Sequence, residues 1–398
     1  MIPETMTSTE RLLAAVNLEP TDRVPVFPHL NAEFPLKLAG RPVSDAYDIT
    51  KGADVVALML KLREESGFDG LTQACGGMAF SDELIKLYAF FYGDTMRYPG
   101  GDDRVDADSS PPQFAERAIA TPEDYDAIIA LGWNNWCGEN MDRISKSLFG
   151  LPLDQYPLSQ IAAASTAGYV NCRDDFARRD IPIIAGTVPS DAQMILSLLR
   201  TLTGFSMDLY RCPDKVTEVL KVISRDITQG AIDSMLRAGP PSASGLPGIM
   251  VAAERGSGAY YNLKVFEKFV WPYMREAIHA WVDAGFVVTM HMDTNWTKNF
   301  PYFLDLPRKK CIAMLDSTSD IFKAKEILGN HMCIMGDVPP ALSTLGTVEE
   351  MEAYCRKLIE VVGKGGGFIL GTGCAVPAET KIENFKAMIN SAKKYSAH

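Results

Sequence analysis

The chain alternates short apolar segments with helical segments along most of its length. Eight segments rich in β-branched, aromatic or aliphatic residues have the length and composition of buried strands. They cover residues 24–30, 70–74, 181–184, 248–252, 286–291, 311–315, 332–335 and 368–370. Because the apolar runs are nearly continuous, we expect both faces of each strand to be covered, as in parallel sheets. The pattern predicts an α/β fold, a (β/α)8 TIM barrel, with a doubly wound open sheet as the alternative.

Helix signals separate these segments. Thr7 with Glu10, and Thr347 with Glu350, have the spacing of capping boxes at helix starts. Residues 46–65 are predicted to form a long amphipathic helix, and 266–281, 321–328 and 351–361 have helical spacing as well. The connectors between the fourth and the eighth strands are therefore predicted to be helical, as a barrel requires.

About a hundred residues, 78–180, interrupt this rhythm between the second and third strands. A structureless loop of this length is uncommon, so we expect a mostly helical insert or cap within a single barrel domain, 1–398. Trp133 and Trp136 in this insert either line a substrate pocket or docking rim, or pack inside the cap. Packing is favoured because large aromatic side chains are usually buried.

Composition narrows the class of protein. The formal net charge of −11 over 398 residues argues against nucleic-acid binding, which usually needs a basic patch. The eight Cys are scattered without a Cys-x-x-Cys pair, which suits a reducing compartment. The N-terminal residues do not resemble a signal peptide, and no apolar run is long enough for a membrane span. We therefore expect a cytoplasmic protein that does not contact a membrane.

Polar side chains gather where the predicted strands end, which is where barrels build active sites. These residues are His29, Asn31, Cys75, Asp191, Glu254, His291, Asp293, Asp316, Asp337 and Cys374. Sulfur, imidazole nitrogen and carboxylate oxygen together are the ligand set of zinc. His291 and Asp293 are two residues apart and point to the same side of an extended segment. From spacing alone, a metal site and a set of buried polar rim residues both remain open.

Several stretches resemble the uroporphyrinogen decarboxylase superfamily. They are residues 10–15 with 22–26, then 324–329, 335–340 and 366–374, followed by Pro377 and Glu383-Asn384. The resemblance covers about 8–78 and 181–395, and it implies a (β/α)8 barrel. Decarboxylases of this superfamily carry an Arg-rich segment after strand one, which grips the substrate carboxylates. Here the corresponding residues 27–35 contain no Arg, which argues against decarboxylation of a polycarboxylate.

The other branch of the superfamily comprises corrinoid-linked methyltransferases. Their zinc is held by His-x-Cys after strand five, a carboxylate about two dozen residues later, and a Cys after strand eight. The resemblance assigns these roles to His291, Asp316 and Cys374, while Asp293 replaces the His-x-Cys thiolate. The fourth ligand is then Asp293 or another group such as Glu254. Fewer thiolates make a harder, more electrophilic ion, which suits an ether oxygen better than a thiol.

The resemblance therefore suggests methyl transfer from an aryl methyl ether of the methoxyphenol type to the Co(I) corrinoid of a separate corrinoid protein. Glu254 and His29 are the candidate catalytic groups, although each could equally be a rim residue or, for Glu254, part of an ion pair. Asn31, Cys75 and Asp191 are candidate substrate contacts. The alternatives are a methylcorrinoid:thiol methyltransferase of the coenzyme M type, a metal-free uroporphyrinogen decarboxylase, and a non-catalytic binding barrel. A homo-oligomer is compatible with the sequence.

Overall fold

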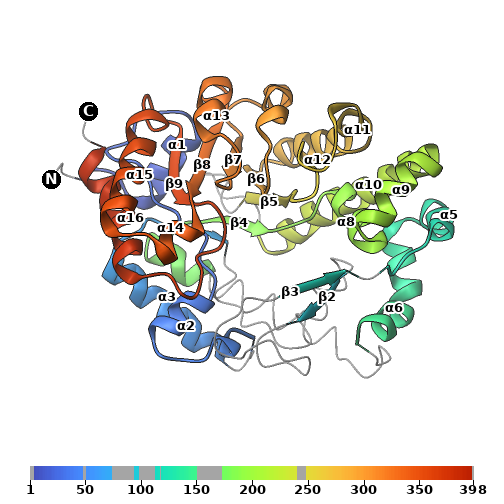
Figure 1. The fold of residues 1–398 in the computed structure, drawn as a ribbon, viewed down its shortest axis with the longest axis horizontal. Coiled ribbons are helices and arrows are strands. Elements are labelled where there is room, and N and C mark those ends of the chain that lie inside the picture. The colour runs from blue at the N-terminus through green and yellow to red at the C-terminus, as the bar shows by residue number, and fades with distance from the viewer. Residues whose placement is uncertain are drawn as a thin grey trace.

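A parallel sheet forms the centre of the protein. The computed structural model describes residues 4–47, 51–73, 94–97, 113–116, 118–149, 173–239 and 248–396. In this part seven parallel strands follow the order β1-β4-β5-β6-β7-β8-β9. Their bounds are β1 Leu71–Gln73, β4 Ile183–Thr187, β5 Gly248–Ala252, β6 Val288–Met292, β7 Cys311–Leu315, β8 Cys333–Val338 and β9 Phe368–Thr372. Helices surround the sheet (Figure 1), and the chain is an α/β protein of the barrel-like kind.

The first predicted strand, 24–30, joins the two edges of this sheet. Phe27 N–H donates to Leu370 O of β9 (2.9 Å), and Asp69 N–H, just before β1, donates to Val26 O (2.9 Å). Only an isolated bridge between Val26 and Leu370 is present, so the segment does not count as a regular strand. Pro25 and Pro28 account for the difference, because proline has no N–H to donate to a ladder. The sheet curls into a barrel-like ring through this extended segment.

Helices form the outer layer. Their bounds are α1 Ser8–Val16, α2 Glu33–Leu38, α3 Gly52–Ser66, α8 Ala192–Arg200, α9 Leu202–Arg211, α10 Pro213–Arg237, α11 Leu263–Phe269, α12 Trp271–Asp283, α13 Ile321–Leu328, α14 Pro340–Leu345, α15 Val348–Val361 and α16 Ile382–Tyr395, with 3-10 helices at Val43–Tyr47 and Thr297–Asp305. Both predicted capping boxes, at Thr7 and Thr347, are confirmed. The long helix predicted for 46–65 is shorter, because a separate 3-10 turn precedes α3.

The described part of the insert contains strands as well as helices. Strands β2 (Asp94–Arg97) and β3 (Gln113–Glu116) pair antiparallel, and α5 (Pro122–Leu131) and α6 (Trp133–Phe149) follow. Trp133 and Trp136 are 6% and 0% exposed, and their rings stack with centroids 5.6 Å apart. Both side chains are therefore buried, as the favoured interpretation of these two residues expects.

Apolar side chains fill the ring, and α1 covers one end of it. Leu12, Ala15 and Val16 of α1 pack with inward-facing side chains of the strands. The strand residues in this cluster are Ile184, Ala185, Met250, Ile312, Met314, Cys333, Met335 and Ile369. These side chains come mainly from the first half of each strand, so α1 closes the amino-terminal end. The carboxyl ends of the strands, where the candidate site residues follow, lie at the opposite end.

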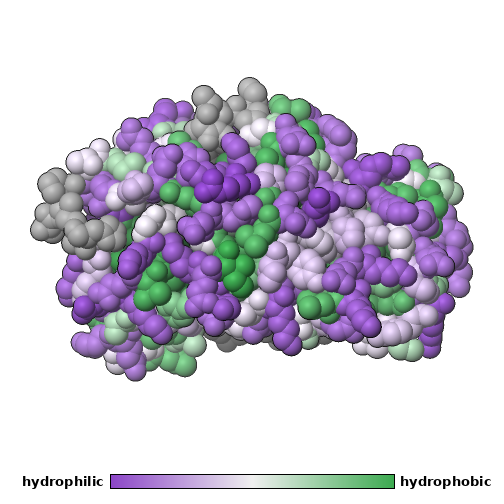
Figure 2. Space-filling view, turned by 90° about the horizontal axis from the view of Figure 1, so that it is seen from above, coloured by the Kyte–Doolittle hydropathy of each residue, from purple (hydrophilic) through white to green (hydrophobic). Residues whose placement is uncertain are grey.

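The surface is mainly polar. Figure 2 shows that hydrophilic residues cover most of the face seen from above, with hydrophobic residues in small patches. Within the described ranges, every helix is too short or too polar to cross a bilayer.

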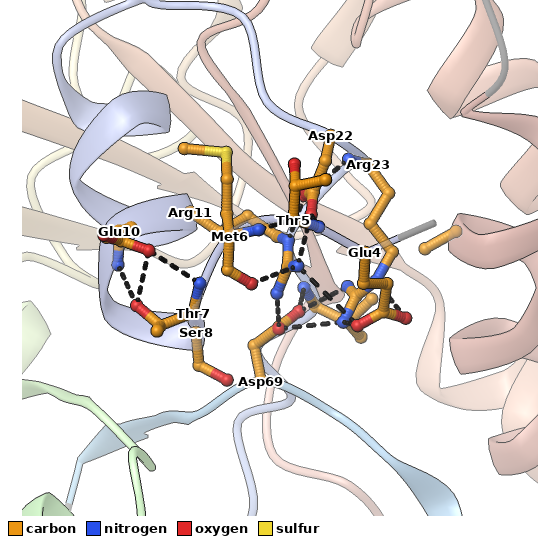
Figure 3. A network of polar contacts seen from close by, with 12 residues as sticks. Glu4, Thr5, Met6, Thr7, Ser8, Glu10, Arg11, Asp22, Arg23 and Asp69 are labelled. Carbon is orange, nitrogen blue, oxygen red and sulfur yellow. Dashed lines mark hydrogen bonds and ion pairs between the residues drawn. The ribbon is translucent and has the colours of Figure 1, made fainter. Parts of the chain in front are cut away.

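A buried ionic network joins α1 to the ring (Figure 3). Asp69 is 1% exposed and accepts hydrogen bonds from Arg11 Nη1 (2.6 Å), Arg23 Nη1 (2.7 Å) and Val26 N–H (2.8 Å). Arg11 also donates two hydrogen bonds to Asp22, from Nε (2.7 Å) and Nη2 (2.9 Å). Arg11, Asp22 and Arg23 belong to the segments 10–15 and 22–26, which resemble the family. They therefore lie at the closed end of the ring, where residues usually serve stability.

Asp22 makes the stability of this network depend on pH. Burial by itself would raise the pKa of Asp22, but hydrogen bonds from Arg11 and from the backbone N–H groups of Met6 and Thr5 hold it well below its usual range. A lowered folded pKa adds stability above the unfolded pKa, and this stability is lost as the pH falls toward the folded pKa. We expect the wild type to be more stable than Asp22→Asn at pH 7, with the difference shrinking below about pH 4. Urea denaturation across this range measures the difference, and a constant value would contradict the prediction.

Candidate functional site

Three potential metal ligands converge at the carboxyl ends of β6 and β9. His291 is in β6, Asp293 follows that strand, and Cys374 lies just beyond β9. One nitrogen, one carboxylate oxygen and the sulfur of these residues all lie within 4.8 Å of one another. His291 Nε2 and Asp293 Oδ1 are 3.5 Å apart. The spacing of His291 and Asp293 therefore places both on the same side, as predicted, and the fold adds a sulfur from a strand far along the chain.

A glycine allows the Cys374 loop to approach its neighbours. Gly373 N–H donates to Val338 O at the end of β8 (2.9 Å). A Cβ atom at this position would lie 3.0 Å from Ser317 N and 3.3 Å from Asp337 O. Only a residue without a side chain fits between the ends of β7 and β8 without displacing them.

Hydrogen bonds to Asp316 hold the loop after β6. Its Oδ2 accepts from Thr294 N–H (2.8 Å), directly after Asp293, and its Oδ1 accepts from Thr318 N–H (3.0 Å) and Oγ1 (2.7 Å). Trp296 Nε1 donates to Asp293 O (2.8 Å) on the same loop. Asp316 is outside the group of three converging ligands. Its role as a ligand stays a prediction, and its contacts make it a residue that positions Asp293.

The cluster is rich in acidic groups. Burial raises the pKa of Asp293, and the nearby Asp316 carboxylate raises it further, while His291 and a hydrogen bond from Cys374 oppose the change. Burial and the Asp293 carboxylate raise the pKa of the Cys374 thiol to about 12. His291 Nδ1 is buried and has no hydrogen-bond partner among the described residues. Converging nitrogen, oxygen and sulfur donors fit a divalent metal ion such as zinc.

His29 lies against this cluster. Its ring stacks on that of His291 with centroids 5.3 Å apart. Gln73 Nε2 lies 3.1 Å from His29 Nε2, and Thr72 Oγ1 lies 3.1 Å from Nδ1. Because the Gln73 amide nitrogen only donates, His29 Nε2 accepts and Nδ1 carries the proton. Burial, with a smaller contribution from His291, lowers the pKa of His29 to about 3, so the ring is neutral at pH 7.

Glu254 follows β5, the strand that pairs with β6. Its Oε2 is buried without a hydrogen-bond partner in the described part of the chain. Burial raises the pKa of Glu254 to about 8, and the charges of Asp293 and Asp191 contribute. The backbone joins these residues, since Ala253 N–H donates to His291 O (3.2 Å). Glu254 is therefore a protonated carboxyl at neutral pH, next to the candidate metal ligands.

The remaining predicted residues are spread around the same end of the ring. Asp191 caps α8. Asn31 has a buried Oδ1 that lacks a partner among the described residues. Asp337 accepts a hydrogen bond from Tyr354 Oη of α15 (2.8 Å), which ties it to the outer helices, and burial raises its pKa to about 7. Cys75 lies outside the described residues.

Sequence reasoning missed several members of this region. Thr72 and Gln73 hold His29, and Gln193 Nε2 donates to Tyr261 Oη (3.1 Å). Glu116 of the insert pairs with Arg255, next to Glu254, at 2.6 Å. The apolar pattern of β1 and the helical pattern of α8 hid the first three residues, because periodicity does not show which polar side chain turns inward.

The fold and the cluster define a barrel-like α/β protein with a potential metal-ligand set at the carboxyl ends of its strands. The sequence profile of the uroporphyrinogen decarboxylase family (URO-D) matches residues 180–395, more than half of the chain. The chain belongs to this family. The matched residues include β4 to β9, and with them His291, Asp293 and Cys374.

Individual relatives match shorter stretches. A uroporphyrinogen decarboxylase from Coxiella burnetii is 27% identical over 103 residues, which is 25% of this chain and 28% of that protein. Another from Trichodesmium erythraeum is 32% identical over 88 residues, 22% of this chain and 24% of the relative. The chain thus matches about a quarter of the length of these curated relatives. The solved structure of a methyltransferase from Methanosarcina mazei has the same fold, with a TM-score of 0.69, 18% identity and coverage of 98% and 100% of the two chains.

Proposed function

We propose that this protein is a zinc-dependent methyltransferase. It moves the methyl group of an aryl methyl ether, of the methoxyphenol type, to the Co(I) corrinoid of a separate corrinoid protein. The observation that carries the proposal is the convergence of His291, Asp293 and Cys374 within 4.8 Å. The fold shared with a methyltransferase supports it.

The donor set suits an oxygen-containing methyl donor. His291 nitrogen, Asp293 oxygen and Cys374 sulfur would hold the zinc ion, and Asp316 would supply a further oxygen. A divalent ion held by one thiolate and several oxygens would be a hard Lewis acid, which is suited to polarising an ether oxygen. A phenoxide is easier to expel than an alkoxide, since a phenol has a pKa of about 10.

Glu254 supplies the proton that the departing oxygen needs. In the reaction the methyl–oxygen bond breaks, the methyl group is transferred to Co(I), and the phenoxide oxygen takes a proton from the Glu254 carboxyl. Its pKa of about 8 keeps this carboxyl protonated at neutral pH. His29, held by Thr72 and Gln73, supports the His291 ring by stacking and restricts its orientation.

In this proposal the corrinoid comes with a partner protein. The sequence contains no Asp-x-His-x-x-Gly segment, because none of its five His stands in that context. A corrinoid protein would dock over the carboxyl ends of the strands, where the candidate ligands lie.

Decarboxylation is the function named for the curated relatives. Against it stands the segment 27–35, which carries His29 in place of arginines. Arg255, near the site, is paired with Glu116. A porphyrinogen with many carboxylates would require cations that these residues do not provide.

The test is a methyl-transfer assay with zinc-loaded protein, ortho-methoxyphenol and free cob(I)alamin as the acceptor. We expect the visible spectrum of methylcobalamin to appear together with catechol. Failure with every methoxyarene would overturn the proposal. Formation of methyl thioether from methylcobalamin and coenzyme M would favour the thiol-acceptor alternative, and carbon dioxide release from uroporphyrinogen by metal-free protein would favour the decarboxylase.

Replacement of the proposed proton donor gives a further prediction. Glu254→Gln keeps the shape of the side chain but cannot donate a proton to the phenoxide, so kcat should fall on the order of 10²-fold. In the wild type kcat should decline as the pH rises through about 8, when Glu254 loses its proton, and the variant should lack this decline. Glu276→Gln, an exposed position on α12, is the matched control. An unchanged pH profile in Glu254→Gln would exclude the role.

A further inference from the structure

We propose that Asp191 and Gln193 form a subsite that accepts hydrogen bonds from a ring substituent of the methyl donor and disfavours donors that carry a carboxylate. This inference rests on the proposed function and deepens it, because it names the substituents that the methyl donor carries. It uses residues on the β4 and β5 side of the site, away from the candidate metal ligands.

Asp191 has one oxygen in use and one free. Its Oδ1 accepts from Met194 N–H (3.0 Å) and caps α8. The residue is only 6% exposed, and its Oδ2 is buried and has no hydrogen-bond partner among the described residues. A buried carboxylate oxygen without a partner is costly, so such an oxygen marks a position where a ligand can donate a hydrogen bond.

Backbone hydrogen bonds connect Asp191 to the rest of the site. Its N–H donates to Ala252 O at the end of β5 (3.1 Å). Glu254 follows two residues later, and Ala253 N–H donates to His291 O (3.2 Å). Glu254 thus follows a strand end that is hydrogen-bonded both to Asp191 and to His291, and the charges of Asp191 and Asp293 both act on its carboxyl.

Gln193 adds a second acceptor on the same turn of helix. It is 1% exposed, and its Nε2 donates to Tyr261 Oη (3.1 Å). Its Oε1 is buried without a partner in the described part of the chain. The Tyr261 contact fixes the amide, so that the free oxygen keeps its position before a ligand binds.

The charge of the surroundings opposes an anionic substituent. Asp191 and Asp293 are both acidic, and the charges of both act on the neighbouring Glu254. Arg255, the neighbouring cation, is bound to Glu116 of the insert at 2.6 Å. A carboxylate on the methyl donor would be repelled in this region, whereas a hydroxyl or amino group on the donor would meet free acceptors.

Three methyl donors separate these effects. The compound ortho-methoxyphenol can donate one hydrogen bond from its hydroxyl group, ortho-dimethoxybenzene can donate none, and a hydroxymethoxybenzoate adds an anionic group. We expect KM to be lowest for ortho-methoxyphenol, and about 10-fold or more higher for each of the other two compounds.

Asp191→Asn is the discriminating variant. Asn is an equally good N-cap, so its side-chain oxygen keeps the bond to Met194, while an amide nitrogen replaces the free oxygen. KM for ortho-methoxyphenol should then rise about 10-fold or more, with kcat nearly unchanged. KM for ortho-dimethoxybenzene should stay within a few-fold, and KM for the benzoate should fall. The control is Asp320→Asn, which alters the exposed N-cap of α13 and should change none of these values.

A binding measurement separates this inference from the proposed function. Calorimetry with ortho-methoxyphenol, zinc-loaded protein and no corrinoid measures affinity alone. Binding that is weakened in Asp191→Asn, without methyl transfer in the wild type, would retain the subsite and reject the function. Equal affinity of the wild type and the variant, or no binding to the wild type, would overturn the subsite.

Discussion

Replacing His291 or Cys374 with Ala should remove the bound zinc and lower methyl transfer by about 10³-fold or more. Each change removes one of the three ligands that converge within 4.8 Å in the described part of the chain, and a polarising metal ion contributes several kcal/mol to the stabilisation of developing charge. Metal content per chain and kcat are the two measurements. The expected result is a parallel loss of both.

The chain offers matched controls for this experiment. Cys212, a partly exposed thiol between α9 and α10, and His279 of α12, whose Nε2 lies 3.1 Å from Asp305 O, are both outside the group of converging ligands. Their Ala variants should keep the metal and the activity. Full metal content in His291→Ala and in Cys374→Ala would reject this metal site.

Asp293→Cys tests why an aspartate stands here. The variant should still bind zinc, because a second thiolate is a good ligand. X-ray absorption should then report an additional sulfur neighbour, and transfer from the aryl ether should slow because the ion becomes softer. An unchanged rate with the ether would argue against an electronic role for this substitution.

Asp69→Asn should lower the free energy of unfolding by about 3–5 kcal/mol, a large share of the stability of most domains. Asp69 is 1% exposed and accepts hydrogen bonds from Arg11, Arg23 and Val26. A neutral amide removes the buried anion that Arg11 and Arg23 share, which leaves Arg11 with Asp22 and Arg23 with the partly exposed Glu4. Because Val26 lies in the segment that joins β9 to β1, we expect the ring to open there first. Chemical denaturation at pH 7 gives the free energy.

An exposed ion pair provides the comparison for Asp69. Asp54 pairs with Arg41 at 3.0 Å, but its side chain is 61% exposed, so Asp54→Asn should cost less than about 1 kcal/mol. Should Asp69→Asn fail to fold, Arg23→Lys keeps the charge but loses the two-pronged contact and should destabilise the protein by a smaller amount. Similar costs for the Asp69 and Asp54 variants would contradict the structural role of the network.

The sequence predicted the regular strands well. Residues 248–252 and 311–315 were predicted as strands with the bounds of β5 and β7, because a short, continuous apolar run between turn residues is typical of a buried strand. Segment 24–30 was assigned a strand by its apolar side chains, although two prolines remove its ladder donors. The strands within the insert were not predicted, because β2 and β3 lack a long apolar run.

The candidate ligands were predictable one by one, but their contacts were not. The His291-x-Asp293 spacing and the Gly373-Cys374 turn were visible in the sequence, whereas their approach to within 4.8 Å depends on the curl of the sheet. Asp316 shows that position in the chain does not predict what a side chain contacts. It falls where a ligand was expected, yet the fold turns its oxygens toward Thr294 and Thr318.

By itself, the sequence determined the order of strands and helices, the end of the strands at which polar residues collect, and the family resemblance, because all three depend on local pattern. Only the tertiary structure decided which of those polar residues meet. The barrel-like ring brings His291 beside Cys374 and stacks His29 on His291. It also leaves oxygens of Asp191 and Glu254 buried without partners among the described residues. Contacts between residues far apart in the chain follow from the closure of the ring, which no local pattern encodes.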